Sequence, residues 1–164
     1  MTKVLAGHLA PAFTLHTTRG ETVSLAGALA KGPVVAAFFK ITCPVCQFTF
    51  PFLERLYKAH RGDAVSFVGI SQSDAADTRE FIDEYGVTFP IVTDEDGYPA
   101  SNNYGLTTVP TIFLIAPDGK VSVSSVGFCK ADIEKIAKEL ADHLEKASVR
   151  VFLPSEVVPD YKPG

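Results

Sequence analysis

Continuous apolar runs alternate along the chain with helix-length segments in which apolar residues recur at helical spacing. Residues 32–40 and 64–71 are such runs, and they favour strands buried on both faces, as in a parallel sheet. Residues 44–60 follow the first run with helical spacing, and Pro51 is expected to kink this helix. The pattern predicts a strand–helix–strand unit in this part of the chain.

The remaining segments extend the alternation to the end of the sequence. A turn separates residues 12–17 from 21–25, which predicts a hairpin, and a Pro-Asp-Gly turn joins two expected strands within 110–127. The other expected elements are helices at 73–86 and 130–147, a short strand at 89–94, a loop or short helix at 97–105, and an edge strand at 149–153. We therefore predict an α/β fold with a mixed β-sheet, forming one domain over residues 1–153 before an extended, proline-rich tail at 154–164.

Composition narrows the class of protein without changing this outline. The chain has 164 residues, 46% of them hydrophobic, and a net charge of −4, which is ordinary for a globular domain. It has no run of Lys or Arg, so nucleic acid is not an expected partner. No apolar run is long enough to cross a bilayer, and the first residues lack the apolar stretch of a signal peptide. We therefore expect no membrane contact and a cytoplasmic location.

Cys43 and Cys46 form a CPVC motif at the expected junction between the first buried strand and its helix. Pro44 suits the first helical turn, where its missing N–H would have no partner in any case. The positive end of the helix favours a thiolate, so we expect the pKa of Cys43 to lie below about 8.5. Cys43 is the expected attacking thiol and Cys46 the resolving thiol, while Lys40 is a candidate modulator of their reactivity.

Metal binding and simple burial are the alternative interpretations of this cysteine pair. A structural zinc site needs four ligands, and the third cysteine and the four histidines have no paired spacing. Two inert core cysteines would be unusual at a strand–helix junction. We therefore favour redox chemistry through a Cys43–Cys46 disulfide, with no metal or organic cofactor.

Residues 38–56 resemble the active-site segment of thioredoxin-fold proteins, and Pro51 matches the kink proline of that family. Residues 107–121 resemble the family's cis-proline strand and hairpin. The resemblance implies a cis peptide bond between Val109 and Pro110, with Pro110 beside the cysteines. It also implies that the Val109 backbone pairs with an incoming substrate strand.

Residues 6–39 and the helix-containing insert at 73–106 are similar to parts of TlpA/ResA-like reductases and AhpC/TSA peroxiredoxins. The resemblance implies a thioredoxin-like fold, with a central mixed sheet of about five strands flanked by helices, an N-terminal β-hairpin and a helix-containing central insert. It further implies a thiol-disulfide oxidoreductase that acts on protein disulfides or thiols and receives electrons from a separate reductase.

Three positions depart from the family's pattern. Ala37 stands where thioredoxins carry a buried Asp, Thr42 where they carry Trp, and Thr49 where ResA-like reductases carry Glu. No carboxylate is therefore expected to assist the resolving thiol in the family's usual way. Thiol–disulfide exchange itself requires only a thiolate and a leaving thiol, so we retain this chemistry, but its rate and direction do not follow from the sequence.

A thiol peroxidase of the AhpC/TSA type is the alternative function. When the strands and motifs are aligned, Cys46 takes the position of the peroxidatic cysteine, Cys43 that of a helper Thr, and a helper Arg would fall near Pro110. Because both helpers are missing, we favour disulfide exchange with proteins over peroxide reduction. A non-catalytic binding module is the third hypothesis.

Cys129 lies at the expected start of the last helix, directly after Gly127 and Phe128. Those two residues match a loop that packs beside the active site in thioredoxin folds. The Cys129 thiol is either an additional redox or modification site near Cys43, or a helix-start residue that faces the core. We favour the second interpretation.

Overall fold

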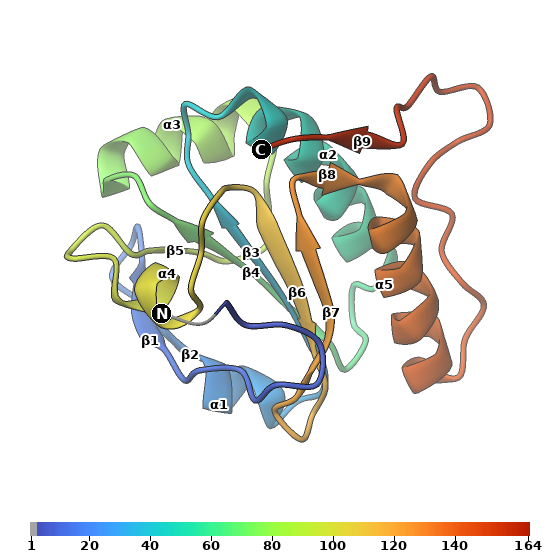
Figure 1. The fold of residues 1–164 in the computed structure, drawn as a ribbon, viewed down its shortest axis with the longest axis horizontal. Coiled ribbons are helices and arrows are strands. Elements are labelled where there is room, and N and C mark those ends of the chain that lie inside the picture. Colours follow the sequence, from blue (N-terminus) through green and yellow to red (C-terminus); the bar gives the residue numbers. More distant parts are fainter. Residues whose placement is uncertain (1–2) are drawn as a thin grey trace.

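A seven-stranded mixed β-sheet runs through the centre of the molecule, as described by a computed structural model over residues 3–164 (Figure 1). Its strands, in spatial order, are β2 (Thr22–Ser24), β1 (Thr14–Thr17), β5 (Ile91–Thr93), β4 (Ser66–Ser71), β3 (Val34–Phe39), β6 (Thr111–Ile115) and β7 (Val121–Val126). The three adjacent strands β5, β4 and β3 are parallel, and the other neighbours pair antiparallel. Strand β3 lies within the sheet, with β4 on one side and β6 on the other.

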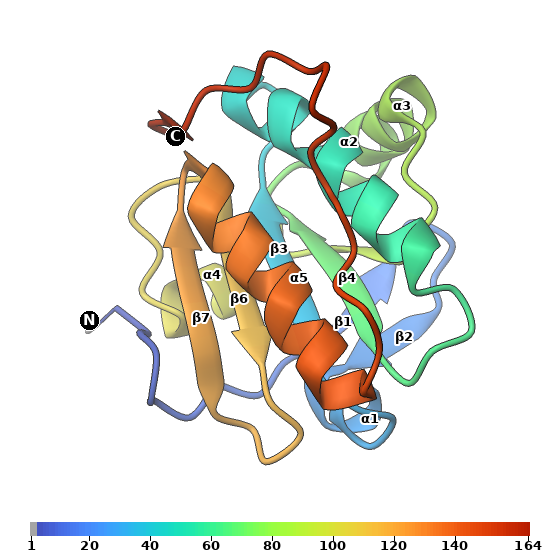
Figure 2. The same cartoon turned by 90° about the vertical axis from the view of Figure 1, so that its right-hand side faces the viewer.

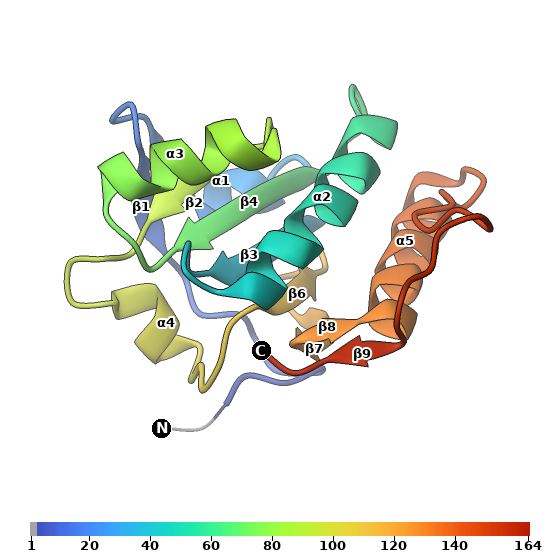
Figure 3. The same ribbon diagram turned by 90° about the horizontal axis from the view of Figure 1, so that it is seen from above.

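Helices cover both faces of this sheet (Figure 3). One face carries α2 (Pro44–Ala59), α3 (Ala75–Tyr85) and α5 (Lys130–Leu144), and the other carries the short helices α1 (Leu25–Leu29) and α4 (Pro99–Asn103). The molecule therefore has three layers, and both faces of the inner strands are buried.

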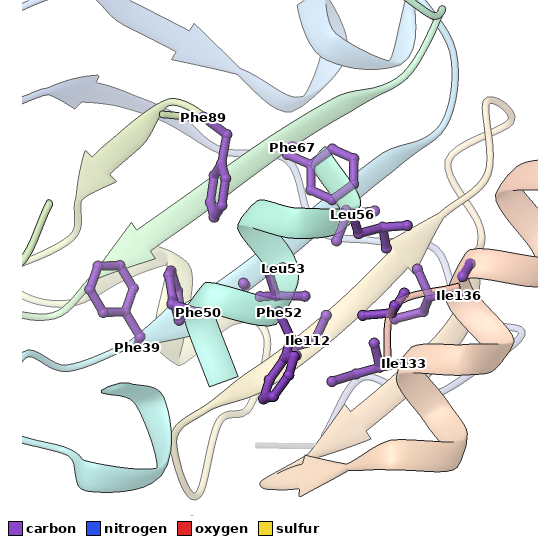
Figure 4. Close-up of a cluster of buried hydrophobic side chains, with 14 of the residues drawn as sticks. Phe39, Phe50, Phe52, Leu53, Leu56, Phe67, Phe89, Ile112, Ile133 and Ile136 are labelled. Atoms are coloured by element: carbon purple, nitrogen blue, oxygen red, sulfur yellow. The ribbon is translucent and has the colours of Figure 1, made fainter. Parts of the chain in front are cut away.

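Alternation along β3 divides the core into two clusters. Val35, Ala37 and Phe39 face α2 and α5, whereas Val34 and Phe38 face α1 and α4. This is the period of two that a strand imposes on its side chains. On the α2 side, aromatic and aliphatic side chains from several elements interlock around Phe50 and Leu53 (Figure 4). Each fully buried side chain of this size contributes about 1.5–3 kcal/mol, so this core fixes the position of α2 on the sheet.

Helix α2 begins at the CPVC motif and continues through Pro51. Cys43 is its N-cap residue and Pro44 opens its first turn, as the sequence predicts. Further along, the carboxylate of Glu54 is buried and accepts hydrogen bonds from the backbone N–H and the hydroxyl of Thr88, in the loop before β5. This contact connects α2 to the parallel strands.

The segment after α5 folds back over the molecule. Residues 149–153 do not form the predicted edge strand, and that prediction was wrong. Val151 and Phe152 are consecutive yet both buried, which a half-exposed strand does not allow, and the Arg55 guanidinium takes the Val151 carbonyl as its acceptor at 2.6 Å. The strand in this region is β9 (Tyr161–Lys162), which pairs antiparallel with β8 (Phe128–Cys129).

The predicted thioredoxin-like architecture is otherwise confirmed. The N-terminal hairpin, the strand–helix–strand unit, the hairpin around the Pro-Asp-Gly turn and the last amphipathic helix all form, and the segment at 97–105 contains the short helix α4. The predicted start of the domain at residue 1 lies outside the described residues. None of the helices within residues 3–164 combines the length and the apolar character that a membrane span requires.

We expect Glu54→Ala to destabilise the fold. Alanine preserves helix propensity but removes the acceptor of both Thr88 hydrogen bonds. Since hydrogen bonds to a charged group contribute about 1.5–3 kcal/mol, the free energy of unfolding should fall by about that amount. Urea denaturation followed by circular dichroism measures the change. Glu80→Ala, on the exposed side of α3, is the matched control and should cost less than about 0.5 kcal/mol; equal losses in the two variants would contradict the assignment.

Candidate active site

The pairing of β3 with β6 places the two loops that form the candidate site side by side. These strands are antiparallel neighbours, and Phe38 near the end of β3 lies opposite Thr111 at the start of β6. The chain leaves β3 toward Cys43, and it enters β6 through Val109 and Pro110. The loop carrying Cys43 and the loop carrying Pro110 therefore meet at one edge of the sheet. Their meeting is direct, since the Cys43 thiol donates a hydrogen bond to the Val109 carbonyl, with the sulfur 3.6 Å from the oxygen.

The peptide bond between Val109 and Pro110 is cis, as the family resemblance implies. Pro110 is buried and its carbonyl accepts a hydrogen bond of 2.8 Å from the Gly127 amide, while Val109 is half-buried. The bond to Gly127 connects the proline loop to the segment before α5. Among residues 3–164, no hydrogen bond uses the amide N–H of Val109.

The two cysteines have different environments. All three cysteines of the chain are free thiols, but Cys43 is half-buried and Cys46 has no exposed surface. The Cys46 amide donates to the Cys43 sulfur at 3.2 Å, which is an N-cap hydrogen bond that stabilises negative charge on that sulfur. Burial, and secondarily the hydrogen bond with Cys43, raise the pKa of the Cys46 thiol well above its usual range. Cys43, at the end of the helix, is thus the more exposed of the two cysteines, whereas burial keeps Cys46 in its protonated thiol form.

A shallow groove of about 510 Å³ opens beside Cys43. Its walls include Cys43, Pro44, Val109 and the exposed Lys40, four of the residues proposed from the sequence. It also contains residues that the sequence did not single out: Gln72, Thr107, Thr108 and Gly164. Thr107 and Thr108 directly precede Val109 and come with the cis-proline segment. Nothing in the local sequence marks Gln72 or Gly164, because they reach the groove from other segments of the chain.

The family's carboxylate positions are filled by groups that cannot accept a proton. Ala37 and Thr49 are both buried. The Thr49 hydroxyl donates to the Val45 carbonyl one turn earlier, at 2.6 Å, so its hydrogen is held within its own helix. The sequence-based expectation that Thr49 does not replace the missing Glu as a base agrees with this geometry.

Cys129 caps the N-terminus of α5 without a side-chain hydrogen bond to the helix. It is half-buried and lies opposite Tyr161 in the β8–β9 pair. Burial raises the pKa of its thiol. The preceding residue, Phe128, is fully buried and packs edge-on against Phe48 of α2, with ring centroids 5.0 Å apart. Cys129 is thus a helix-start residue, and it also lies on the segment that borders the site.

A second hollow, of about 610 Å³, lies between the β1–β2 hairpin and α3. Charged side chains of both signs line it, among them Arg19, Arg79 and Asp83. Neither cysteine of the CPVC motif lines it. We therefore place the candidate active site at the smaller groove, where the thiols are.

A strand–CPVC–helix junction beside a cis-proline defines the class of dithiol oxidoreductases with a thioredoxin-like fold. Residues 6–124 match the model of the AhpC/TSA family, and the chain belongs to this family. It is 32% identical over 132 residues to the thiol-disulfide oxidoreductase ResA of Halalkalibacterium halodurans, a match that covers 79% of this chain and 74% of the relative. It is 34% identical over 116 residues to ResA of Bacillus subtilis, covering 70% of this chain and 64% of that protein.

Solved structures agree with these sequence matches. A putative thiol:disulfide interchange protein DsbE from Chlorobium tepidum superposes with a TM-score of 0.77 at 26% identity, covering 87% of this chain and 99% of the other. A secreted Mycobacterium tuberculosis disulfide oxidoreductase, homologous to DsbE, gives a TM-score of 0.64 at 27% identity and covers 81% of this chain and 94% of its own. The predicted resemblance to TlpA/ResA-like proteins and the predicted thiol-disulfide oxidoreductase activity are confirmed at this level.

A short pulse of iodoacetamide at neutral pH should label Cys43 before the other two thiols. Cys46 is buried, and raised pKa values keep Cys46 and Cys129 protonated, whereas alkylation requires the thiolate. Raising the pH should next add label at the half-exposed Cys129, and Cys46 should react last. Peptide mapping by mass spectrometry reads the order, and the same pulse in denaturant, where all three should react alike, is the control. Early labelling of Cys46 would contradict the assignment.

Proposed function

We propose that this protein exchanges disulfides with protein substrates, with Cys43 as the attacking thiolate and Cys46 as the resolving thiol. The observation that carries the proposal is the placement of the Cys43 sulfur. It lies at the N-terminus of α2, accepts a hydrogen bond from the Cys46 amide, and lies 3.6 Å from the Val109 carbonyl oxygen. A nucleophile and a backbone segment able to align an extended peptide are thereby brought together.

The reaction proceeds in two exchange steps. The Cys43 thiolate attacks one sulfur of the substrate disulfide, forms a mixed disulfide, and releases the other substrate sulfur as a thiolate. Cys46 then loses its proton and attacks the Cys43 sulfur, which releases the second substrate sulfur and leaves a Cys43–Cys46 disulfide. Two electrons pass from the dithiol to the substrate in this direction, and the reverse sequence oxidises a substrate dithiol.

Deprotonation of Cys46 is the demanding part of this sequence. Its pKa is raised by burial, and neither Ala37 nor Thr49 supplies a base. The substrate thiolate released in the first step is a base generated at the site, and we propose that it, or water in the groove, takes the proton. Pro44, Val109 and Pro110 position the substrate, while Lys40 modulates the thiols from the groove wall. Cys129, at the start of α5, has no role in this sequence of steps.

The substrate class and the electron supply are part of the proposal. An extended segment with a disulfide fits the Val109 backbone. The Val109 amide N–H has no hydrogen-bond partner in the described part of the chain, which supports strand pairing with a protein substrate. A separate reductase returns the protein to its dithiol form. The proposed reaction involves no metal, organic cofactor, nucleic acid or membrane. The cytoplasmic location stays a prediction, and one solved relative is described as secreted.

Cys46→Ser should trap the reaction halfway. This variant retains Cys43 but cannot resolve the mixed disulfide, so incubation with insulin should yield a covalent adduct that reducing agent removes. Non-reducing gels and intact-protein mass spectrometry detect it. Cys43→Ser should give no adduct through the motif, and Cys129→Ser should behave like the unmodified protein. If Cys46→Ser forms no adduct, Cys43 is not the attacking thiol.

The peroxidase alternative predicts a different response to hydrogen peroxide. The match to the AhpC/TSA family favours testing it, but the candidate peroxidatic residue, Cys46, is fully buried with a raised pKa. We therefore expect the reduced protein to consume stoichiometric peroxide at a rate near that of free cysteine, measured by stopped-flow thiol loss. A rate orders of magnitude higher would assign peroxide reduction to Cys46 and make Cys43 its resolving partner.

A further inference from the structure

The last six residues of the described chain run toward the candidate active site, and the last of them, Gly164, lines its groove. After α5, the chain runs between α5 and α2 and then turns toward the end of the sheet where α2 begins (Figure 2). There residues 159–164, which we call the strap, contain β9 and reach the groove beside Cys43. The proposed mechanism gives this segment no role.

Specific contacts hold the chain on its way to the strap. The Arg55 guanidinium donates to both carboxylate oxygens of Glu156, at 2.7 and 3.0 Å, and Glu156 also accepts from the Leu153 amide at 2.8 Å. The Arg55 hydrogen bonds lower the pKa of Glu156 to about 2, so this anchor stays ionised at neutral pH. The Phe152 ring packs against those of Phe52 and Phe128, with ring centroids 4.9 and 5.9 Å away. The path up to residue 156 is thus fixed independently of the strap.

The strap itself is held by backbone pairing and by one cation. The Lys130 amide donates to the Asp160 carbonyl at 2.9 Å, and Tyr161 and Lys162 pair with Cys129 and Phe128. The ammonium of Lys162 lies 4.8 Å from the ring centroid of Phe48, which belongs to α2. These contacts are few, and they involve exposed groups such as Tyr161, which is 54% exposed. The strap is therefore held more weakly than its anchor.

Two glycines allow the strap to approach the site this closely. A Cβ on Gly127, whose φ is +73°, would lie 2.5 Å from the Lys162 carbonyl oxygen. A Cβ on Gly164 would collide with the Val109 carbonyl oxygen and approach the Thr108 hydroxyl to 2.9 Å. The backbone of Gly164 thus lies directly on the carbonyl that, in the proposed function, faces the substrate strand, and the same carbonyl accepts from the Cys43 thiol.

We propose that the strap is an autoinhibitory contact, whose backbone takes the place of an incoming substrate strand beside Val109. Substrate pairing at Val109 and strap contact at Val109 exclude each other, so a protein disulfide reaches Cys43 only from the strap-displaced form. The apparent rate with a protein substrate is lowered by the fraction of molecules in that form. A small disulfide, which needs no strand pairing, is affected much less. This inference rests on the proposed function.

The test compares the full chain with a chain ending at residue 158, using insulin and glutathione disulfide as substrates of the reduced proteins. Removing the strap should raise the second-order rate constant with insulin by at least about five-fold. The rate constant with glutathione disulfide should change by less than about two-fold. A synthetic peptide of residues 157–164, added to the shortened protein, should slow the insulin reaction again.

A matched pair of substitutions tests the strap without shortening the chain. Lys162→Ala removes the cation over Phe48 and should raise the insulin rate constant by about two- to five-fold, whereas Lys162→Arg keeps the cation and should leave it near that of the unmodified protein. Circular dichroism and thermal unfolding check that each variant is folded. If the shortened chain does not fold, the two Lys162 variants alone test whether the strap is autoinhibitory.

The outcomes separate the strap from the function on which it rests. An unchanged insulin rate in both the shortened chain and Lys162→Ala overturns the autoinhibitory role. A lowered rate in either overturns it as well and makes the segment part of the substrate site. If the full and shortened chains react with neither disulfide, while Cys43 remains alkylatable, the proposed function itself fails.

Discussion

The antiparallel ladder between β3 and β6 is the constraint on which the site depends. Because Phe38 is paired with Thr111, the chain that leaves β3 and the chain that enters β6 emerge at the same edge of the sheet. Cys43 and Val109 are 66 positions apart in sequence, yet this register brings the thiol to the carbonyl. A shift of one residue in either strand would turn the apolar side chains of that strand to the opposite cluster, so core packing and site geometry are specified together.

The start of α2 then gives the two cysteines of the motif different environments. Cys43 caps the helix, so its sulfur lies at the positive end and receives a backbone N–H, whereas Cys46 lies one turn inside against the core. The aromatic packing of Phe50 with Phe39 and Phe81 holds the helix in this position. The proposed order of attack rests on burial and helix polarity. It does not require the carboxylates that relatives of this fold carry, which are absent at Ala37 and Thr49.

Local pattern predicts those parts of this structure that are determined locally or by continuous burial. Strands β3 and β4 and helices α2 and α5 follow from apolar runs and helical spacing, and the cap at Cys43 follows from the motif. The approach of Val109 to Cys43 came from the family resemblance. Segment 149–153 differs from its predicted edge strand. Its alternation of apolar and polar residues resembles a strand, but the Val151 carbonyl is bound by the Arg55 side chain, nearly a hundred positions away, and not by a neighbouring strand. A two-residue pair such as β8–β9 leaves no periodic signal at all.

The strap illustrates a general difficulty of this architecture. A site that binds an extended peptide must keep backbone groups unpaired, and unpaired strand-like backbone is a surface on which other chains can add. Within residues 3–164 the Val109 amide has no hydrogen-bond partner and is such a group, and a weakly held segment of the same chain lies over the Val109 carbonyl. The anchor at Arg55 and Glu156 keeps the strap close to the groove, which raises its effective concentration there although its own contacts are few. Strong anchoring followed by weak final contacts is the arrangement expected of a segment that protects a binding edge and yields to a substrate.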